Sequence, residues 1–228
     1  RLTVYQITVL IPAYNEELRL AATLRAVFKR QRQRQVIVVD DGSRDRTAEI
    51  AAQFPVELVR LPTNQGKAKA VEVGLRQATG EIIVLLDGDL AETAYFYPQL
   101  VDPLLTGTAR MVVARLTSPK GSGGVGVVRK VANWGCYWLT RQHFPALLSG
   151  QRAFFYSDLP YLLPLGQGFG LEFALTVRAI KKGIPIVALP VPMEHAYTVR
   201  NFAGFRHRSR QFRDICRTIW QLRGEVKS

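Results

Sequence analysis

The sequence predicts an α/β fold, in which a mostly parallel sheet is flanked by helices. Four short apolar runs in the first 92 residues alternate with segments of helical periodicity, and three of these runs end in clusters of polar residues. Apolar strands that alternate with helices are typical of parallel sheets buried on both faces. The chain has 228 residues, of which 47% are hydrophobic and 21% charged, enough for one large domain with a full core.

The predicted elements follow one another in a regular order. We expect strands in ITVLIPAYNE, QVIVVDDGS, VELVRLP and EIIVLLDGD, separated by helices over residues 16–32, in DRTAEIAAQF and in NQGKAKAVEVGLRQATG. Ser43 or Asp45 is placed to cap the second of these helices. The second half adds a strand around MVVA, a glycine-rich loop with a helix that begins near Val125, and a helix and strand in GLEFALTVRAIKKGIPIVALPVP.

The C-terminal segment is basic and amphipathic. We expect a domain over residues 1–198, with halves at 1–92 and 93–198, and a helix over 199–228, where RNFAGFRHRSRQFRDICRTIWQLR places apolar residues on one broad arc beside a stripe of arginines. Such a helix either packs on the domain with a solvated basic edge or lies at an anionic bilayer surface. The aromatic stretch NWGCYWLTRQHF likewise either belongs to the core or lies among lipid headgroups.

Three predicted strands end in polar clusters, namely Tyr14-Asn15-Glu16, Asp40-Asp41-Gly42-Ser43 and Asp87-Gly88-Asp89. Ligands of parallel sheets gather beyond the carboxyl ends of the strands, so we expect the clusters to form one site. Two aspartates this close repel each other unless they are protonated or share a cation, and Gly88 lets the chain turn so that both side chains converge. Mg²⁺ or Mn²⁺, completed by substrate phosphates, suits such a pair, and a solvated turn is the alternative.

Charge and motifs restrict the class of protein. Lys and Arg number 31 against 18 Asp and Glu, a formal charge of +13 that favours nucleic acid, anionic lipid or phosphorylated substrates. We find no helix-turn-helix, RNP or zinc pattern, no G-x-G-x-x-G after the first strand and no P-loop. We expect neither a membrane-spanning helix nor a signal peptide. The two cysteines lack metal-ligand spacing and predict a reducing compartment.

Four motifs occur in order: VLIPAYNE, VVDDGSRDRT, NQGKAKAVEVGL and VLLDGDL. Together they resemble the inverting family 2 glycosyltransferases with the Rossmann-like GT-A fold, strongly over residues 7–92 and more loosely over 110–200. The resemblance implies a nucleotide-sugar half followed by an acceptor half.

The resemblance also implies roles for matched residues. The nucleotide-sugar residues are Pro12, Tyr14, Glu16, Asp40, Asp41, Lys67, Asp87 and Gly88, with Lys67 near the base or diphosphate and Asp87 near the ribose and metal. Asp89 binds the metal that bridges the diphosphate. A metal and a lysine neutralise the charge that develops on the leaving group. The alternative for Lys67 is a solvated position in the first turn of its helix. His195 is the candidate third metal ligand, because Ala91 stands where the lipid-phosphate subfamily often has Gln.

The acceptor half contains SGQRA, which is similar to the SGFRA segment of dolichyl- and polyprenyl-phosphate sugar transferases, with Gln151 in place of an aromatic residue. The resemblance implies that Ser149, Arg152, Arg115 and Arg129 bind the lipid phosphate. Each arginine taken alone could be a surface cation. The resemblance also places Glu172 at the sugar hydroxyls or makes it the general base. A hydroxyl acceptor needs such a base, and a phosphate acceptor does not.

We therefore expect a metal-dependent transferase with Asp89, Glu172 and Arg152 in its catalytic group. It would move a hexose from a UDP- or GDP-sugar to a polyprenyl or dolichyl phosphate, as a peripheral protein at the cytoplasmic face of an anionic membrane. The alternatives are a soluble acceptor (a small phosphorylated acid or a growing glycan), a nucleic-acid-binding module suggested by the charge alone, and an inactive metal-bound scaffold. The base, the sugar, the acceptor and the oligomeric state stay open.

Overall fold

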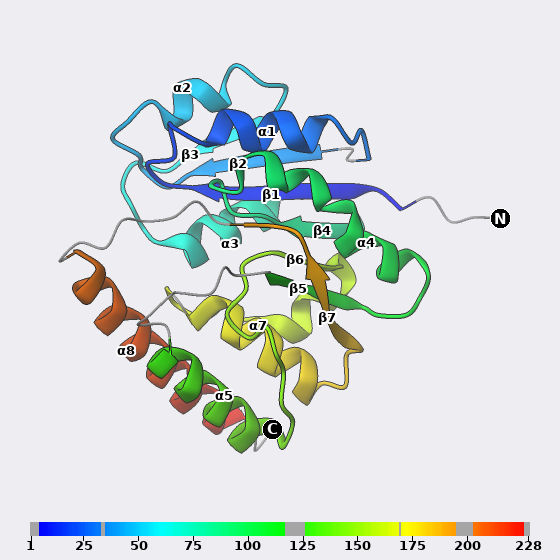
Figure 1. The fold of residues 1–228 in the computed structure, drawn as a ribbon, viewed down its shortest axis with the longest axis vertical. Coiled ribbons are helices and arrows are strands. Elements are labelled where there is room, and N and C mark those ends of the chain that lie inside the picture. The colour runs from blue at the N-terminus through cyan, green and yellow to red at the C-terminus, as the bar shows by residue number, and fades with distance from the viewer. Residues whose placement is uncertain (1–4, 33–34, 117–125, 169, 195–202, 226–228) are drawn as a thin grey trace.

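A mostly parallel sheet of seven strands forms the centre of the molecule, in the order β3-β2-β1-β4-β6-β5-β7 (Figure 1). The structure is a computed structural model that describes residues 5–32, 35–116, 126–168, 170–194 and 203–225, with the backbone alone over 203–210. The strands are β1 (Ile7–Ala13), β2 (Gln35–Asp40), β3 (Glu57–Arg60), β4 (Ile82–Leu85), β5 (Met111–Leu116), β6 (Arg152–Phe155) and β7 (Ile186–Val191). The predicted α/β class is confirmed.

The helices connect these strands and cover the sheet. They are α1 (Leu20–Phe28), α2 (Thr47–Ala51), α3 (Lys67–Gln77), α4 (Pro98–Leu105), α5 (Gly126–Thr140), α6 (Leu159–Leu162), α7 (Gly170–Lys181) and α8 (Ala203–Gly224), with 3₁₀ turns η1 (Ala91–Phe96) and η2 (Tyr156–Asp158). The N-cap residue of α2 is Arg46, without a side-chain capping hydrogen bond, so the prediction that Ser43 or Asp45 caps this helix is wrong. Asp45, one residue earlier, accepts a hydrogen bond from the Thr47 N–H at 3.0 Å.

Strand β6 is the main element that the sequence did not predict. It pairs antiparallel with both β4 and β5, whereas the other neighbouring strands are parallel. Its sequence, RAFF, begins with an arginine, so a pattern based on hydrophobicity does not predict a buried strand here. This one inserted strand is the reason that the sheet is mostly, and not entirely, parallel.

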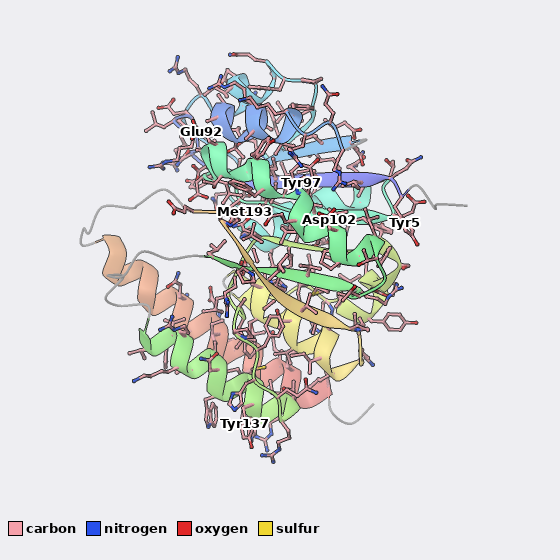
Figure 2. All side chains as sticks on the ribbon, turned by 45° about the vertical axis from the view of Figure 1, so that its right-hand side comes forward. Tyr5, Glu92, Tyr97, Asp102, Tyr137 and Met193 are labelled. Carbon is pink, nitrogen blue, oxygen red and sulfur yellow. The ribbon has the colours of Figure 1, made fainter. Side chains whose placement is uncertain are left out.

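Side chains alternate between two cores on the two faces of the sheet. Leu10 of β1 points into the core shared with α3, α5, α7 and α8, and its neighbours Val9 and Ile11 point into the core shared with α1 and α4. Tyr97 and Met193, labelled in Figure 2, belong to the second of these cores. Continuous apolar strands thus bury both faces, and polar groups concentrate where the strands end.

The C-terminal helix α8 packs against α5 and α7 (Figure 1). Ile215, Ile219 and Leu222 are buried in this contact, and a Cβ at Gly135 of α5 would overlap the Ile219 side chain. Packing on the domain, one of the two expected arrangements, is therefore present. Two residues of the predicted apolar arc, Phe212 and Cys216, are exposed instead.

Candidate functional site

The three polar clusters lie side by side at one edge of the sheet. Strands β1, β2 and β4 are parallel neighbours, so their carboxyl ends meet. The Asn15 N–H donates to the Ser43 hydroxyl at 3.0 Å, which joins the first cluster to the second. A Cβ built on Gly88 would lie 3.4 Å from Cγ of Glu16, which places the third cluster against the first. A Cβ at this distance would make an ordinary van der Waals contact, so the packing of the two loops does not itself require glycine at position 88.

Lys67 is the centre of this edge. Its ammonium lies 2.6 Å from Oδ1 of Asp87 and 2.7 Å from Oε1 of Glu172. Burial lowers the pKa of Lys67, but the attraction of Asp87 and Glu172 outweighs it and raises that pKa above its ordinary value. Lys67 is thus ion-paired, with its side chain 32% exposed, rather than a freely solvated lysine. Lys67 opens α3 and Glu172 lies in the first turn of α7, so two positive helix ends point to one place.

Gln151 is a site residue that sequence reasoning missed. It is fully buried, and its Oε1 accepts the Asp87 N–H at 2.9 Å while its Nε2 donates to Asp87 Oδ2 at 2.6 Å. The neighbouring Gly150 allows this contact, because a Cβ there would lie 2.6 Å from Asp87 Oδ2 and 2.7 Å from Lys67 Nζ. In the sequence, Gln151 stands out only because it replaces the aromatic residue of the SGFRA segment. Nothing in the sequence therefore predicted its hydrogen bonds to Asp87.

Arg152 lies beneath the site rather than on its surface. Its side chain is 0% exposed, and it donates to the Ser149 carbonyl at 2.6 Å and to the Thr176 hydroxyl at 3.3 Å. Burial lowers the pKa of Arg152 to about 10, against the attraction of Glu172 and Asp87. In the described part of the chain, Arg152 Nε and the Ser149 hydroxyl are buried without a hydrogen-bond partner. Both of these atoms are therefore buried away from solvent.

Asp40, the last residue of β2, and Asp41, which follows it, are buried and organise loops. The Asp41 carboxylate accepts the Gln65 N–H at 2.7 Å and the Gly66 N–H at 2.8 Å. Gly66 has a φ of +94°, a backbone conformation that favours glycine, and it directly precedes Lys67. Asp40 accepts the Ser43 N–H at 3.0 Å. Asp41 therefore positions the turn that delivers Lys67 to the site.

The acidic side chains near Gly88 form a set suited to a hard cation. Burial raises the pKa of Glu16 to about 7, and the charges of Asp89 and Asp87 add to this, while Arg19 opposes it. A divalent ion would relieve such repulsion, and the donors are oxygens, which Mg²⁺ and Mn²⁺ prefer. Among the described residues, no three His, Cys, Asp or Glu side chains are grouped as a ready metal cage. The protein oxygens at this site therefore suit a divalent cation whose remaining ligands come from a diphosphate.

The remaining predicted site residues lie farther out or outside the described residues. Pro12 is buried within β1, and Tyr14 is 40% exposed just beyond its end. Arg115 near the end of β5 and Arg129 on α5 are exposed cations. The predicted ligand His195 lies outside the described residues.

Comparisons with known proteins bear on this site. The family model described as glycosyl transferase family 2 matches residues 8–155. The chain is 29% identical over 138 residues to a dolichol-phosphate mannosyltransferase of Pyrococcus furiosus, covering 58% of the chain and 37% of the relative. It is 39% identical over 106 residues to an undecaprenyl-phosphate 4-deoxy-4-formamido-L-arabinose transferase of Pectobacterium atrosepticum, covering 42% and 32%. The chain thus spans only about a third of the length of these two relatives.

Among solved structures, the chain is similar to glucosyl-3-phosphoglycerate synthase of Mycobacterium tuberculosis, in complex with Mn²⁺, UDP and glucosyl-3-phosphoglycerate. The TM-score is 0.81 at 25% sequence identity, over 96% of this chain and 80% of that one. The likeness therefore extends through the second half of the chain, beyond the residues that the family model matches.

Proposed function

The chain belongs to glycosyl transferase family 2, and from this membership we propose that it transfers a hexose from a UDP- or GDP-sugar to the phosphate of a polyprenyl or dolichyl lipid. One observation carries the proposal: Lys67, Asp87 and Glu172 meet at the sheet edge where two helices begin. Asp89 follows two residues after Asp87, and its charge acts on Glu16. Such a place suits a nucleoside diphosphate, because its leaving group gains negative charge as the sugar departs.

The residues of the first half bind the donor. Lys67 exchanges its contact with the carboxylates for the diphosphate oxygens, and Gln151 keeps Asp87 oriented while this happens. Asp87 and Asp89, with His195 as the proposed third ligand, would hold Mn²⁺ or Mg²⁺, which would supply charge neutralisation for the diphosphate. Pro12, Tyr14, Glu16 and Asp40 line the proposed nucleoside pocket, while Asp41 acts through the turn before Lys67.

The acceptor phosphate attacks C1 of the hexose. A new bond forms between C1 and a phosphate oxygen as the bond from C1 to the nucleoside diphosphate breaks, and the diphosphate leaves with the electron pair. An ionised phosphate needs no base, so Glu172 binds the sugar hydroxyls in this reaction. The exposed Arg115 and Arg129 are available to the acceptor phosphate, and the buried Arg152 supports the site from below.

A soluble phosphorylated acid is the second candidate acceptor. The observation in its favour is the structural likeness to glucosyl-3-phosphoglycerate synthase over 96% of this chain, a greater extent than the lipid-phosphate relatives cover. An acceptor that attacks through a hydroxyl must lose a proton, and Glu172 would then be the base. The two candidates therefore assign different chemistry to one side chain.

Transfer from labelled UDP- and GDP-hexoses, followed by partition between butanol and water, distinguishes the two acceptors. With a detergent-solubilised polyprenyl phosphate and Mn²⁺, label should enter the butanol phase. Label found only in the water phase, with 3-phosphoglycerate as acceptor, would reject the lipid assignment.

Asp89→Asn should abolish transfer to either acceptor. The matched control is Asp102→Asn on α4, whose side chain is 55% exposed and which pairs with Arg32 on the surface. Equal loss of activity in the two variants would contradict the role given to Asp89.

A further inference from the structure

Helices α5 and α8 carry a group of exposed aromatic side chains, which we call the aromatic platform: Trp134, Tyr137 and Trp138 on α5, with Phe212 and Trp220 on α8. Their exposed fractions are 61%, 42%, 38%, 42% and 70%. Figure 2 shows Tyr137 at the outer surface of α5, on the opposite side of the molecule from Glu92. All three tryptophans of the chain belong to this surface. Large apolar side chains gathered in this way mark an interaction surface rather than scattered exposure.

The rings contact one another and an arginine that joins the two helices. Trp134 and Trp138 stack with centroids 5.7 Å apart at an angle of 5°. The Arg223 guanidinium lies 5.5 Å from the Trp138 ring centre and 5.2 Å from that of Trp220. The three tryptophans are therefore joined across α5 and α8 through Arg223.

The two helices are strongly basic. Together α5 and α8 contain eight arginines or lysines and a single acidic residue, Asp214. Lys130, Arg141, Arg213 and Arg223 are exposed. Of these, Arg141 lies over the Tyr137 ring and Arg223 over Trp138 and Trp220. Asp214 instead lies against Gly168, where a Cβ would overlap its carboxylate. A partner of this surface must therefore be anionic and must also accept indole and phenol rings.

We propose that the aromatic platform seats the protein on the headgroup layer of an anionic lipid bilayer. Tryptophan and tyrosine favour this layer, and each nearby basic residue adds attraction to anionic lipids. In the described part of the chain, no helix is long and apolar enough to cross a membrane. The choice of a bilayer among anionic partners rests on the proposed function, because a polyprenyl phosphate acceptor resides in one.

Two other partners fit the surface less well. A second copy of the chain related by a two-fold axis would set the same cations against each other, and like charges oppose such a contact. A single-stranded nucleic acid would stack its bases on free ring faces. Here Trp134 and Trp138 cover each other, and Arg223 lies over Trp138 and Trp220.

Helix α8 connects the aromatic platform to the sheet edge at which Lys67, Asp87 and Glu172 meet. Thr218 of α8 lies so close to Gly170 that a Cβ on this glycine would overlap its hydroxyl. Gly170 begins α7, and Glu172 follows in the first turn. Contact of α8 with a bilayer would therefore fix the helix against which the Glu172 turn packs.

Tryptophan fluorescence tests the proposal directly, because every tryptophan lies in the platform. The protein is titrated with vesicles of equal parts phosphatidylglycerol and phosphatidylcholine, and with pure phosphatidylcholine, in low salt. We expect binding to the anionic vesicles, quenching by lipids brominated near the headgroup, and release by added salt. Failure to bind anionic vesicles in low salt, or binding without quenching, would overturn the proposal.

The variants identify the surface. Trp134→Ala combined with Trp220→Ala should weaken vesicle binding at least about tenfold, with Trp138 left as the reporter. Arg213→Gln should weaken it about fivefold. The control Tyr161→Ala removes an aromatic ring that is 55% exposed on α6 and should bind as the unaltered protein does. Unchanged binding of the double variant, or equal loss in the control, would contradict the platform assignment.

Three further readouts separate this proposal from the others. A concentration-dependent dimer that the double variant loses, without vesicle binding, would replace the bilayer with a second copy. Quenching by single-stranded polynucleotide but not by vesicles would replace it with nucleic acid. The double variant should still transfer hexose to detergent-solubilised polyprenyl phosphate. If the unaltered protein binds vesicles but transfers to no polyprenyl phosphate, the proposed function fails and the surface assignment stands.

Discussion

Replacing Lys67 by methionine removes the charge that holds Asp87 and Glu172 together. At separations of 2.6 and 2.7 Å and an effective dielectric constant of about 20, each pair has a Coulomb energy of about 6 kcal/mol. Desolvation opposes most of this, and removing one partner of a fully buried pair costs about 3–5 kcal/mol. The Lys67 side chain is 32% exposed and Asp87 keeps its hydrogen bonds to Gln151, so we expect a loss of about 2 kcal/mol in the free energy of unfolding.

Urea unfolding without metal or nucleotide, followed by circular dichroism, measures this loss. The control Lys29→Met changes an exposed lysine at the end of α1 and should lie within about 0.5 kcal/mol of the unaltered protein. Lys67→Met should also bind Mn²⁺ more tightly in the absence of nucleotide, because Asp87 has lost its internal cation. A variant as stable as the control, with unaltered affinity for Mn²⁺, would refute the assignment of Lys67 as the central cation.

Three other perturbations test the surroundings of the acidic pair. Gln151→Leu removes the hydrogen bonds of Gln151 to the Asp87 amide and carboxylate. We therefore expect a loss of about 10- to 100-fold in affinity for UDP with Mn²⁺, measured by calorimetry. Unchanged affinity would contradict the role of Gln151. Gly150→Ala should lower the rate of transfer at least about tenfold, because its Cβ would lie 2.6 Å from Asp87 Oδ2. The control is Gly126→Ala, whose Cβ would meet no atom within 4 Å. Equal rates in the two variants would be evidence against this contact. Burial raises the pKa of Glu16 from 4.5 to about 7, so its contribution to metal-free stability is present at acid pH and lost as pH rises through about 7. Glu16→Gln should remove about 1–2 kcal/mol of this decline in urea unfolding, because solvent screens the partly exposed carboxylate. An unchanged pH dependence would show that another group is responsible.

The first half of the fold was predictable because its strands are continuous apolar runs between helical segments. The family match and the solved structures confirm the resemblance and the GT-A fold. Strand β6 escaped prediction because Arg152, a residue type expected at the surface, is fully buried at its start. Its antiparallel insertion between β4 and β5 depends on long-range pairing that local periodicity does not contain.

The edge of the site was predictable for a topological reason, and its contacts were not. Parallel strands end at one side of a sheet, so three polar clusters in sequence predict a common edge. The contact of Lys67 with Glu172 joins residues 105 positions apart, and it depends on how α3 and α7 pack. Gln151 had no motif of its own, because its function lies in two hydrogen bonds to Asp87 that only the folded chain creates.

Calorimetric titration of UDP and GDP, with and without Mn²⁺, tests most directly whether a cation at Asp87 and Asp89 neutralises the diphosphate. We predict that one of the two nucleotides binds only when Mn²⁺ is present, and that Asp89→Asn loses this binding while Asp102→Asn keeps it. Binding of the same strength without the metal, or in Asp89→Asn, would contradict the assignment of the acidic pair.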